Sequence, residues 1–186
     1  TGFAPGLVER DWRTGVADGP DELMKAVRYQ AKHGAQVIKI CATGGVSSRN
    51  TEPGQQQMSL AEMKVIADDA HMYGLKVAAH AHGAAGIKDA IRAGVDTIEH
   101  ASLIDDEGIE LAKKHGAYLS MDIYNTEYTQ SEGKKNGVLE DNLRKDREVA
   151  DIQRENFRKA VNLGIKFTMG TDTGVHRRAD APKQLA

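Results

Sequence analysis

The feature that most constrains this chain is a repeated layout, in which a helix-like stretch is followed by a glycine and a short apolar run. The layout occurs in the segments HGAQVIKI (33–40), YGLKVAAH (73–80), AGVDTIEH (93–100), HGAYLSMD (115–122) and LGIKFTMG (163–170). A glycine directly after a helix is the usual left-handed C-cap. Short apolar runs bounded by such signals are typical of strands buried on both faces. The layout therefore predicts five buried strands.

The stretches between these strands have helical periodicity. Ser59 and Glu62 have the spacing of a capping box, which predicts a helix start at residue 60. Helices are expected in five stretches: 21–33, 60–72, around Ile87, around Ile109, and 140–162. The inner face of the last helix is expected to comprise Val149, Ile152, Phe157, Ala160 and Val161.

Alternating strands and helices predict an α/β fold with parallel strands joined by right-handed crossovers. The repeat is short, 20 residues from Gly74 to Gly94 and 22 from Gly94 to Gly116, which favours a TIM (β/α)8 barrel. A doubly wound open sheet has the same local pattern and stays an alternative. Five strands cannot close an eight-stranded barrel, so we expect an incomplete barrel that lacks three strands on its N-terminal side. Residues 1–186 are expected to form a single domain with an irregular lead-in over 1–20.

Composition excludes several classes of protein. The formal net charge is −2, which gives no reason to expect nucleic acid or an acidic membrane surface as a partner. No apolar run approaches the roughly 20 residues that span a bilayer. A single cysteine, Cys41, excludes an internal disulfide framework and suits a reducing compartment, so we expect a cytoplasmic protein.

In both α/β architectures the functional residues lie at the carboxyl ends of the parallel strands. The predicted strands end near Lys39, His80, His100 and Asp172. His82 follows His80 by two positions, which places both imidazoles on one face of a strand. An isolated pair of this kind most often consists of packed core histidines. Ligand-type residues at successive strand ends favour a metal site instead.

The residue types at these ends suit a cation. His80, His100 and Asp172 offer two nitrogens and one oxygen to zinc or a similar divalent ion and leave a position for water. Lys39 is expected to be buried, which would lower the pKa of its amine. A neutral amine reacts with carbon dioxide, and the resulting carbamate bridges two cations. For Lys39 alone, a side chain that reaches outward is the simpler interpretation.

The order of these motifs resembles the amidohydrolase superfamily, and within it the imidazolonepropionase-like branch with its X-Pro dipeptidases (prolidases) and metallocarboxypeptidases. The resemblance rests on VIKICATGGVSS with PGQQQMS, KVAAHAHG, GVDTIEHAS and TMGTDTG, and covers residues 20–175. It implies barrel strands four to eight of a hydrolase that binds one or two zinc-like ions. Such an enzyme cleaves amide C–N bonds of small substrates, dipeptides such as X-Pro or acyl-amino acids, with metal-activated water.

The resemblance also implies roles for individual residues. Lys39 matches the carbamylated bridging lysine, and His80 and His100 match the ligand histidines of strands five and six. Asp172 matches the aspartate that acts as ligand and general base, and His82 matches a histidine that contacts the substrate. The H-x-H motif that the family carries on its first strand has no counterpart before Lys39. We expect a segment that precedes strand four to supply it.

Three further residues are candidates for substrate contact. Arg49 lies in the long loop 43–59 and suits a substrate carboxylate, although an exposed loop charge is an equal interpretation. Tyr124 follows the fourth predicted strand and could donate to a carbonyl or oxyanion; loop packing is the plain alternative. His176 follows the Asp172 loop and could bind a carboxylate, or lie in a solvated tail.

Two other functions stay open. One is a cyclic-amide hydrolase or aminohydrolase of the imidazolonepropionase type. The other is a non-catalytic module that assembles with a partner. For the enzyme, we expect a small amide or dipeptide as substrate and a homo-oligomer as the full-length form.

Overall fold

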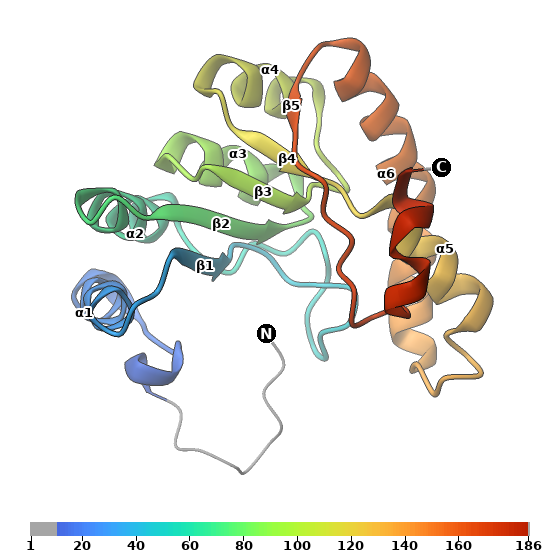
Figure 1. Ribbon diagram of the computed structural model, residues 1–186, viewed down its shortest axis with the longest axis horizontal. Helices are drawn as coiled ribbons and strands as arrows, with labels where there is room; N and C mark the ends of the chain where they lie inside the picture. The colour runs from blue at the N-terminus through green and yellow to red at the C-terminus, as the bar shows by residue number, and fades with distance from the viewer. Residues whose placement is uncertain (1–10, 186) are drawn as a thin grey trace.

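The computed structural model describes residues 11–185, which form a parallel sheet flanked by helices (Figure 1). The strands are β1 (Val37–Cys41), β2 (Lys76–Ala81), β3 (Thr97–His100), β4 (Tyr118–Ser120) and β5 (Lys166–Phe167). β3, β4 and β5 lie within the predicted segments, and β1 and β2 each extend one residue beyond theirs. The helices are α1 (Gly19–Lys32), α2 (Leu60–Met72), α3 (Ala84–Ala93), α4 (Asp106–His115), α5 (Ile123–Glu132) and α6 (Glu140–Asn162), with 3-10 turns η1 (Trp12–Thr14) and η2 (Arg178–Leu185).

The order of the strands decides between the two predicted architectures. All neighbouring strands are parallel, and their order in the sheet, β1-β2-β3-β4-β5, follows the chain. A doubly wound sheet would reverse direction at a switch point, whereas a barrel adds every strand on the same side. Figure 1 shows α1 to α4 along the outer side of the curved sheet. The structure therefore confirms an incomplete (β/α)8 barrel.

The helix boundaries agree with the sequence patterns in most places. Ser59 and Glu62 form the predicted capping box, with Ser59 N donating to Glu62 Oε2 at 2.8 Å and Glu62 N to Ser59 Oγ at 3.3 Å. Helix α1 begins at Gly19, two residues earlier than predicted, because Pro20 suits the first helical turn. The predicted irregular lead-in contains η1, and its residues 1–10 lie outside the described part. No helix within residues 11–185 has the length and apolarity to cross a bilayer.

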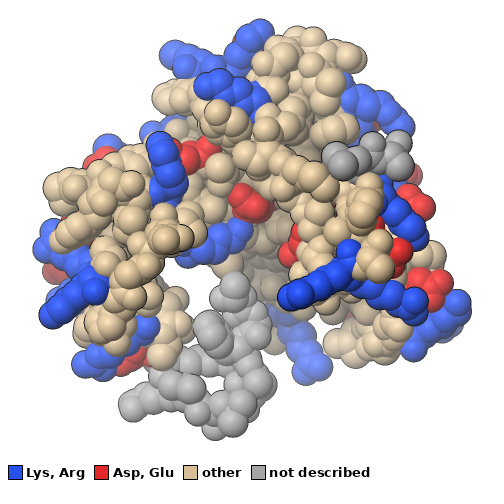
Figure 2. All heavy atoms as spheres, in the orientation of Figure 1, with Lys and Arg blue, Asp and Glu red and all other residues tan. Residues whose placement is uncertain are grey.

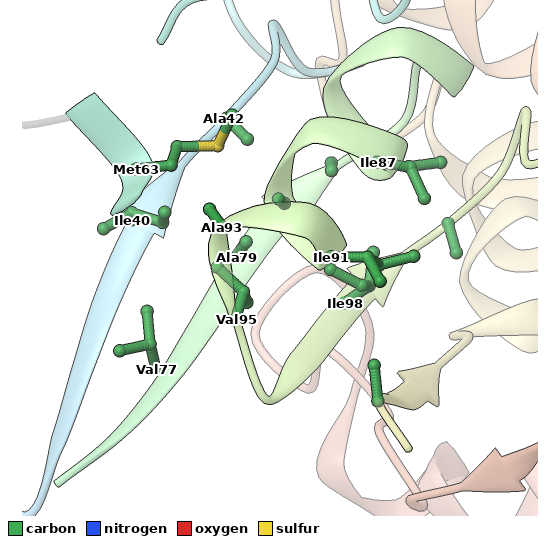
Figure 3. Close-up of a cluster of buried hydrophobic side chains, with 14 of the residues drawn as sticks. Ile40, Ala42, Met63, Val77, Ala79, Ile87, Ile91, Ala93, Val95 and Ile98 are labelled. Atoms are coloured by element: carbon green, nitrogen blue, oxygen red, sulfur yellow. The ribbon is translucent and has the colours of Figure 1, made fainter. Parts of the chain in front are cut away.

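The apolar core lies between the sheet and the helices of its outer side (Figure 3). Ile40, Val77 and Ile98 point from neighbouring strands toward Met63 and Ile91, and all are at least nine-tenths buried. In these strands buried residues alternate with more exposed ones, so the strands are not buried on both faces as predicted. No helix of the described residues covers the opposite, concave face of the sheet.

Lys39 lies on this open face and is exposed, which corrects the prediction that its side chain is buried. The apolar neighbours that suggested burial, Ile38 and Ile40, point to the other side of the strand. β1 is also an edge strand that pairs only with β2 among the described residues.

Helix α6 buries Val149 and Ala160 and half-buries Phe157 as predicted, but it leaves the other two predicted inner residues exposed. Ile152 and Val161 are 45% and 48% exposed. The buried residues of α6 are Leu143, Lys145, Asp146, Val149, Ala150, Gln153 and Ala160. The N-terminal part of α6 packs against α5 at the side toward which the strands point, whereas its C-terminal part, with Phe157 and Ala160, packs against the core (Figure 1). At the side toward which the strands point, α6 also contacts loops with polar groups.

The two isoleucines Ile91 and Ile152 test this assignment of core and surface. Ile91 is completely buried, so Ile91→Ala should lower the free energy of unfolding by about 2–5 kcal/mol through lost burial and a cavity. Ile152→Ala removes the same atoms from an exposed site and should cost less than about 1 kcal/mol. Urea denaturation measures both values. Equal losses would place Ile152 in the core.

Candidate metal centre

Three histidines meet at the carboxyl ends of two neighbouring strands. His80 lies near the end of β2, His82 directly follows β2, and His100 ends β3. Their ring centroids are 4.7 to 4.8 Å apart, and the rings of His82 and His100 are stacked. One ring nitrogen of each lies within 4.8 Å of the others. The predicted placement of His80 and His82 on one side of the strand is confirmed.

His100 joins the cluster through an unusual backbone conformation. The register of β2 and β3 pairs His80 with Glu99 and the buried Ala81 with His100. Regular alternation would therefore point His100 to the face opposite His80. His100 and Ala101 have φ angles of 69° and 48°, in the left-handed region that residues with a Cβ rarely adopt. This break in alternation accompanies the placement of the His100 ring beside His80. Such strain is typical of functional sites.

Each imidazole is oriented by a hydrogen bond from one ring nitrogen. His100 Nδ1 donates to Asp122 Oδ1 at 2.8 Å, and His82 Nδ1 lies 2.9 Å from Ser102 Oγ. His80 Nε2 lies 3.3 Å from the carbonyl oxygen of Gly44. The other nitrogen of each ring makes no hydrogen bond within residues 11–185. Histidines that bind metals are commonly held in this way, through the nitrogen that does not bind the metal.

Burial and charge divide the three imidazoles into two kinds. Burial, with repulsion from His100, lowers the pKa of His80 to about 4 and places the pKa of His82 well below its ordinary value. Burial also acts to lower the pKa of His100, but the charge and hydrogen bond of Asp122, with a contribution from Asp172, raise it overall. His80 and His82 are thus neutral at pH 7, which is the metal-binding form of imidazole.

The donor set fits a divalent cation. Two nitrogens bound to one zinc ion at about 2.1 Å in tetrahedral geometry lie about 3.4 Å apart. The nitrogens of the cluster lie within 4.8 Å of one another, so the rings would have to move closer together to bind one ion. The cluster includes His82, which the sequence analysis assigned to the substrate, so His82 is a candidate ligand as well.

Lys39 and Asp172 lie close to this cluster. The charge of Lys39 lowers the pKa of both His80 and His100, and the charge of Asp172 raises the pKa of His100. Asp172 is exposed, with a left-handed φ of 47°, and its Oδ2 accepts from Asn125 Nδ2 at 3.2 Å. Hydrogen bonds through Asn125 and Asp122 connect Asp172 to His100. Lys39 pairs with Ala78, two positions before His80 on the neighbouring strand.

The other predicted site residues lie farther out. Tyr124 belongs to α5, a helix that the sequence analysis did not predict, and its hydroxyl accepts from Lys183 Nζ at 3.2 Å. His176 is buried against the Tyr124 ring rather than solvated, and its ring nitrogens lie 2.7 and 3.0 Å from the carbonyl oxygens of Thr171 and Arg177. Arg49 is exposed and makes no hydrogen bond or ion pair within the described residues. None of the hydrogen bonds in residues 11–185 joins these three residues to the histidines.

Several polar residues that support the site were not identified from the sequence as part of it. Ser102, Asp122 and Asn125 accept or donate the hydrogen bonds described above, and Gln153 donates to the carbonyl oxygen of His100 at 3.2 Å. The sequence contained a signal for Asp122, because this residue ends the fourth apolar run just as His80 and His100 end the second and third runs. Gln153 had none, because it lies among the charged residues of α6.

A parallel barrel sheet with a histidine cluster at the carboxyl ends of its strands is typical of metal-dependent (β/α)-barrel proteins. The chain belongs to the amidohydrolase family, whose model matches residues 3–183. This confirms the family resemblance of the sequence motifs.

Individual relatives agree with this assignment. The chain is 38% identical to ochratoxinase of Aspergillus niger over 159 residues, which cover 85% of this chain and 33% of the relative. A crystal structure of a Xaa-Pro dipeptidase with bound methionine superposes with a TM-score of 0.88 and 36% identity, covering 98% of this chain and 46% of that one. A prolidase complexed with N-methylphosphonate-L-proline superposes with a TM-score of 0.83 and 31% identity, covering 90% of this chain and 43% of that one. The chain thus spans a third to under half the length of these proteins.

The lowered pKa of His80 predicts how stability depends on pH in the metal-free protein. Above pH 6.5, the ordinary histidine value, His80 is neutral in both the folded and the unfolded state. Between pH 6.5 and 4 the unfolded chain binds a proton at this residue and the folded chain does not, so the free energy of unfolding falls as the pH falls. The difference between the two pKa values corresponds to about 3 kcal/mol.

His80→Gln should remove most of this contribution, which urea denaturation after dialysis against a chelator measures between pH 7.5 and 4. An unchanged pH dependence in the variant would contradict the burial of a neutral His80.

Proposed function

We propose that this chain is part of a metal-dependent hydrolase that cleaves amide C–N bonds of small substrates. The observation that carries the proposal is the cluster of His80, His82 and His100 at the carboxyl ends of β2 and β3. Membership of the amidohydrolase family supports it. On the face shown in Figure 2 the Lys and Arg side chains are spread rather than gathered in one patch, which suits a small substrate better than nucleic acid. We propose a cytoplasmic homo-oligomer as the working form.

The cation would be zinc or another divalent metal, as one or two ions. His80, His100 and Asp172 would hold the first ion, with His82 as a further nitrogen donor or as a contact to the substrate. Lys39, carbamylated by formation of an N–C bond to carbon dioxide and loss of a proton, would bridge to a second ion. The exposure of Lys39 on the concave face leaves its amine accessible for this reaction. A cation at this place polarises a carbonyl group and lowers the pKa of a water molecule.

The side chains would provide the proton transfers. Asp172 accepts the proton of the attacking water and delivers it to the leaving nitrogen, and the hydrogen bond from Asn125 holds its carboxylate in place. Tyr124 would donate a hydrogen bond from its hydroxyl to the carbonyl oxygen as negative charge develops there. Arg49, which is exposed, is proposed to bind the substrate carboxylate. His176 is not proposed for this role, because both of its ring nitrogens already face backbone carbonyl oxygens.

We propose dipeptides of the X-Pro type as the first substrates to examine, with acyl-amino acids as the next class. Two similar structures, the Xaa-Pro dipeptidase and the prolidase complexed with a phosphonate of L-proline, support the first choice. Both belong to proteins more than 30% identical to this chain.

Metal content tests the ligand set. The full-length protein should retain one or two zinc ions per chain, and His80→Ala or His100→Ala should lower this number, because each removes a nitrogen donor. Elemental analysis after gel filtration measures the content. His115→Ala is the matched control, since His115 is exposed in the last turn of α4 and should not affect binding. Metal content unchanged by the His80 and His100 substitutions would refute the site.

Activity of the full-length protein tests the reaction. X-Pro dipeptides should be hydrolysed faster than acyl-amino acids or cyclic amides, and Asp172→Asn should lower kcat by about 10²–10⁴-fold, because the proton acceptor is lost. Asp68→Asn on the exposed face of α2 is the matched control. Preferred turnover of cyclic amides would support the imidazolonepropionase-type alternative, and absence of any turnover would support the non-catalytic one.

A further inference from the structure

Helix α6 contacts the surroundings of all three histidines through polar side chains on one face. Lys145, Gln153 and Asn156 share this face with the apolar residues Val149 and Ala160, since the intervals of three, four and eight residues return to the same side of a helix. Lys145 and Gln153 are each 1% exposed. Burial of polar groups costs stability unless they are hydrogen-bonded. Lys145 and Gln153 therefore need hydrogen-bond partners inside the protein.

Gln153 contacts the surroundings of His100. Its Nε2 donates to the carbonyl oxygen of His100 at 3.2 Å and lies 3.4 Å from Asp122 Oδ1, the atom that accepts from His100 Nδ1. One amide group therefore holds both the left-handed backbone at His100 and the carboxylate that orients its ring. Gln153 Oε1 is buried and has no partner within the described residues. The side-chain NH₂ group of Gln153 is thus used as a hydrogen-bond donor, whereas its carbonyl oxygen accepts no hydrogen bond from the described residues.

Asn156 acts at His82 in a similar way. Its Nδ2 donates to the carbonyl oxygen of Ser102 at 3.0 Å, and the hydroxyl of Ser102 is the partner of His82 Nδ1. Ser102 is completely buried, so its position depends on contacts within the protein.

Lys145 reaches His80 through the loop between β1 and α2. Its Nζ donates to the carbonyl oxygen of Ser48 at 2.8 Å and pairs with Asp141 at 2.9 Å. Ser48 N in turn donates to the carbonyl oxygen of Gly45, next to the Gly44 carbonyl that faces His80 Nε2. The loop lies so close to His80 that a Cβ on Gly45 would be 3.0 Å from Nε2.

We propose that α6 is the positioning element of the metal centre, with Gln153, Asn156 and Lys145 as the positioning residues of His100, His82 and His80 respectively. The role in metal binding rests on the proposed function, because it assumes that the histidines hold a cation. The orientation of the rings does not depend on that assumption. Residues that orient ligands from the second layer commonly contribute 10- to 100-fold to metal affinity.

Zinc affinity of the full-length protein is the first test. Gln153→Met keeps the size of the side chain and removes its donors, and we expect it to weaken Zn²⁺ binding by about 10-fold or more in a competition titration. Asn156→Leu, at a half-buried position, provides the same test if Gln153→Met does not fold. Val149→Ala is the matched control. Val149 lies on the same face, is 3% exposed and has no hydrogen-bonding group in its side chain, so the change should lower the melting temperature without changing zinc affinity.

Histidine side-chain NMR of the metal-free protein is the second test, and it separates positioning from general stability. The ring ¹⁵N signals of His100 should change most in Gln153→Met, those of His82 in Asn156→Leu and those of His80 in Lys145→Met. Val149→Ala should not change the ring ¹⁵N signals of any one of the three histidines selectively.

The two tests also separate the two proposals. Wild-type protein that binds no zinc would refute the proposed function, while the ring signals would still decide whether α6 orients the histidines. Wild-type zinc affinity in the folded α6 variants, or an equal loss in Val149→Ala, would refute the positioning role.

Discussion

The buried carboxylate of Asp122 is the interaction on which the rest of the site depends. It accepts from His100 Nδ1 at 2.8 Å and from Asn125 Nδ2 at 2.9 Å, and Gln153 Nε2 lies 3.4 Å away. These partners come from β3, α5 and α6, so one charge links three elements. A carboxylate that is only 4% exposed requires such partners, because an unpaired buried charge is strongly destabilising. Burial would raise the pKa of Asp122, and the charge and hydrogen bond of His100 outweigh that effect and lower it.

The same network extends to the catalytic carboxylate that we propose. Asn125 Nδ2 contacts both Asp122 and Asp172, and thereby joins the end of β4 to the loop after β5. Asp172, like His100, has a left-handed backbone. Two strained residues at the ends of separate strands, connected by one asparagine and one aspartate, indicate a site whose geometry is maintained against a local cost.

The protonation of the cluster follows from its burial. His80 and His82 have lowered pKa values and are ready to bind a cation, whereas His100 shares its proton with Asp122. The fully buried Lys145 and Gln153 on α6 are the costly part of this arrangement. Their contacts on the loop before His80 and on the backbone of His100 give these polar groups hydrogen-bond partners, and link the long helix to the site.

The sequence by itself determined the order of the strands and of every helix except α5, and the short strand–helix repeat that is typical of a barrel. It also singled out Lys39, His80, His100 and Asp172. Periodicity and glycine caps report these features, because they depend on neighbours within a few positions. Only the tertiary structure decided that Lys39 is exposed, that His100 leaves the regular alternation of β3, and that α6 turns a polar face inward. Those outcomes depend on contacts between distant positions, 22 residues apart for His100 and Asp122 and 53 for Gln153 and His100, which no local pattern records.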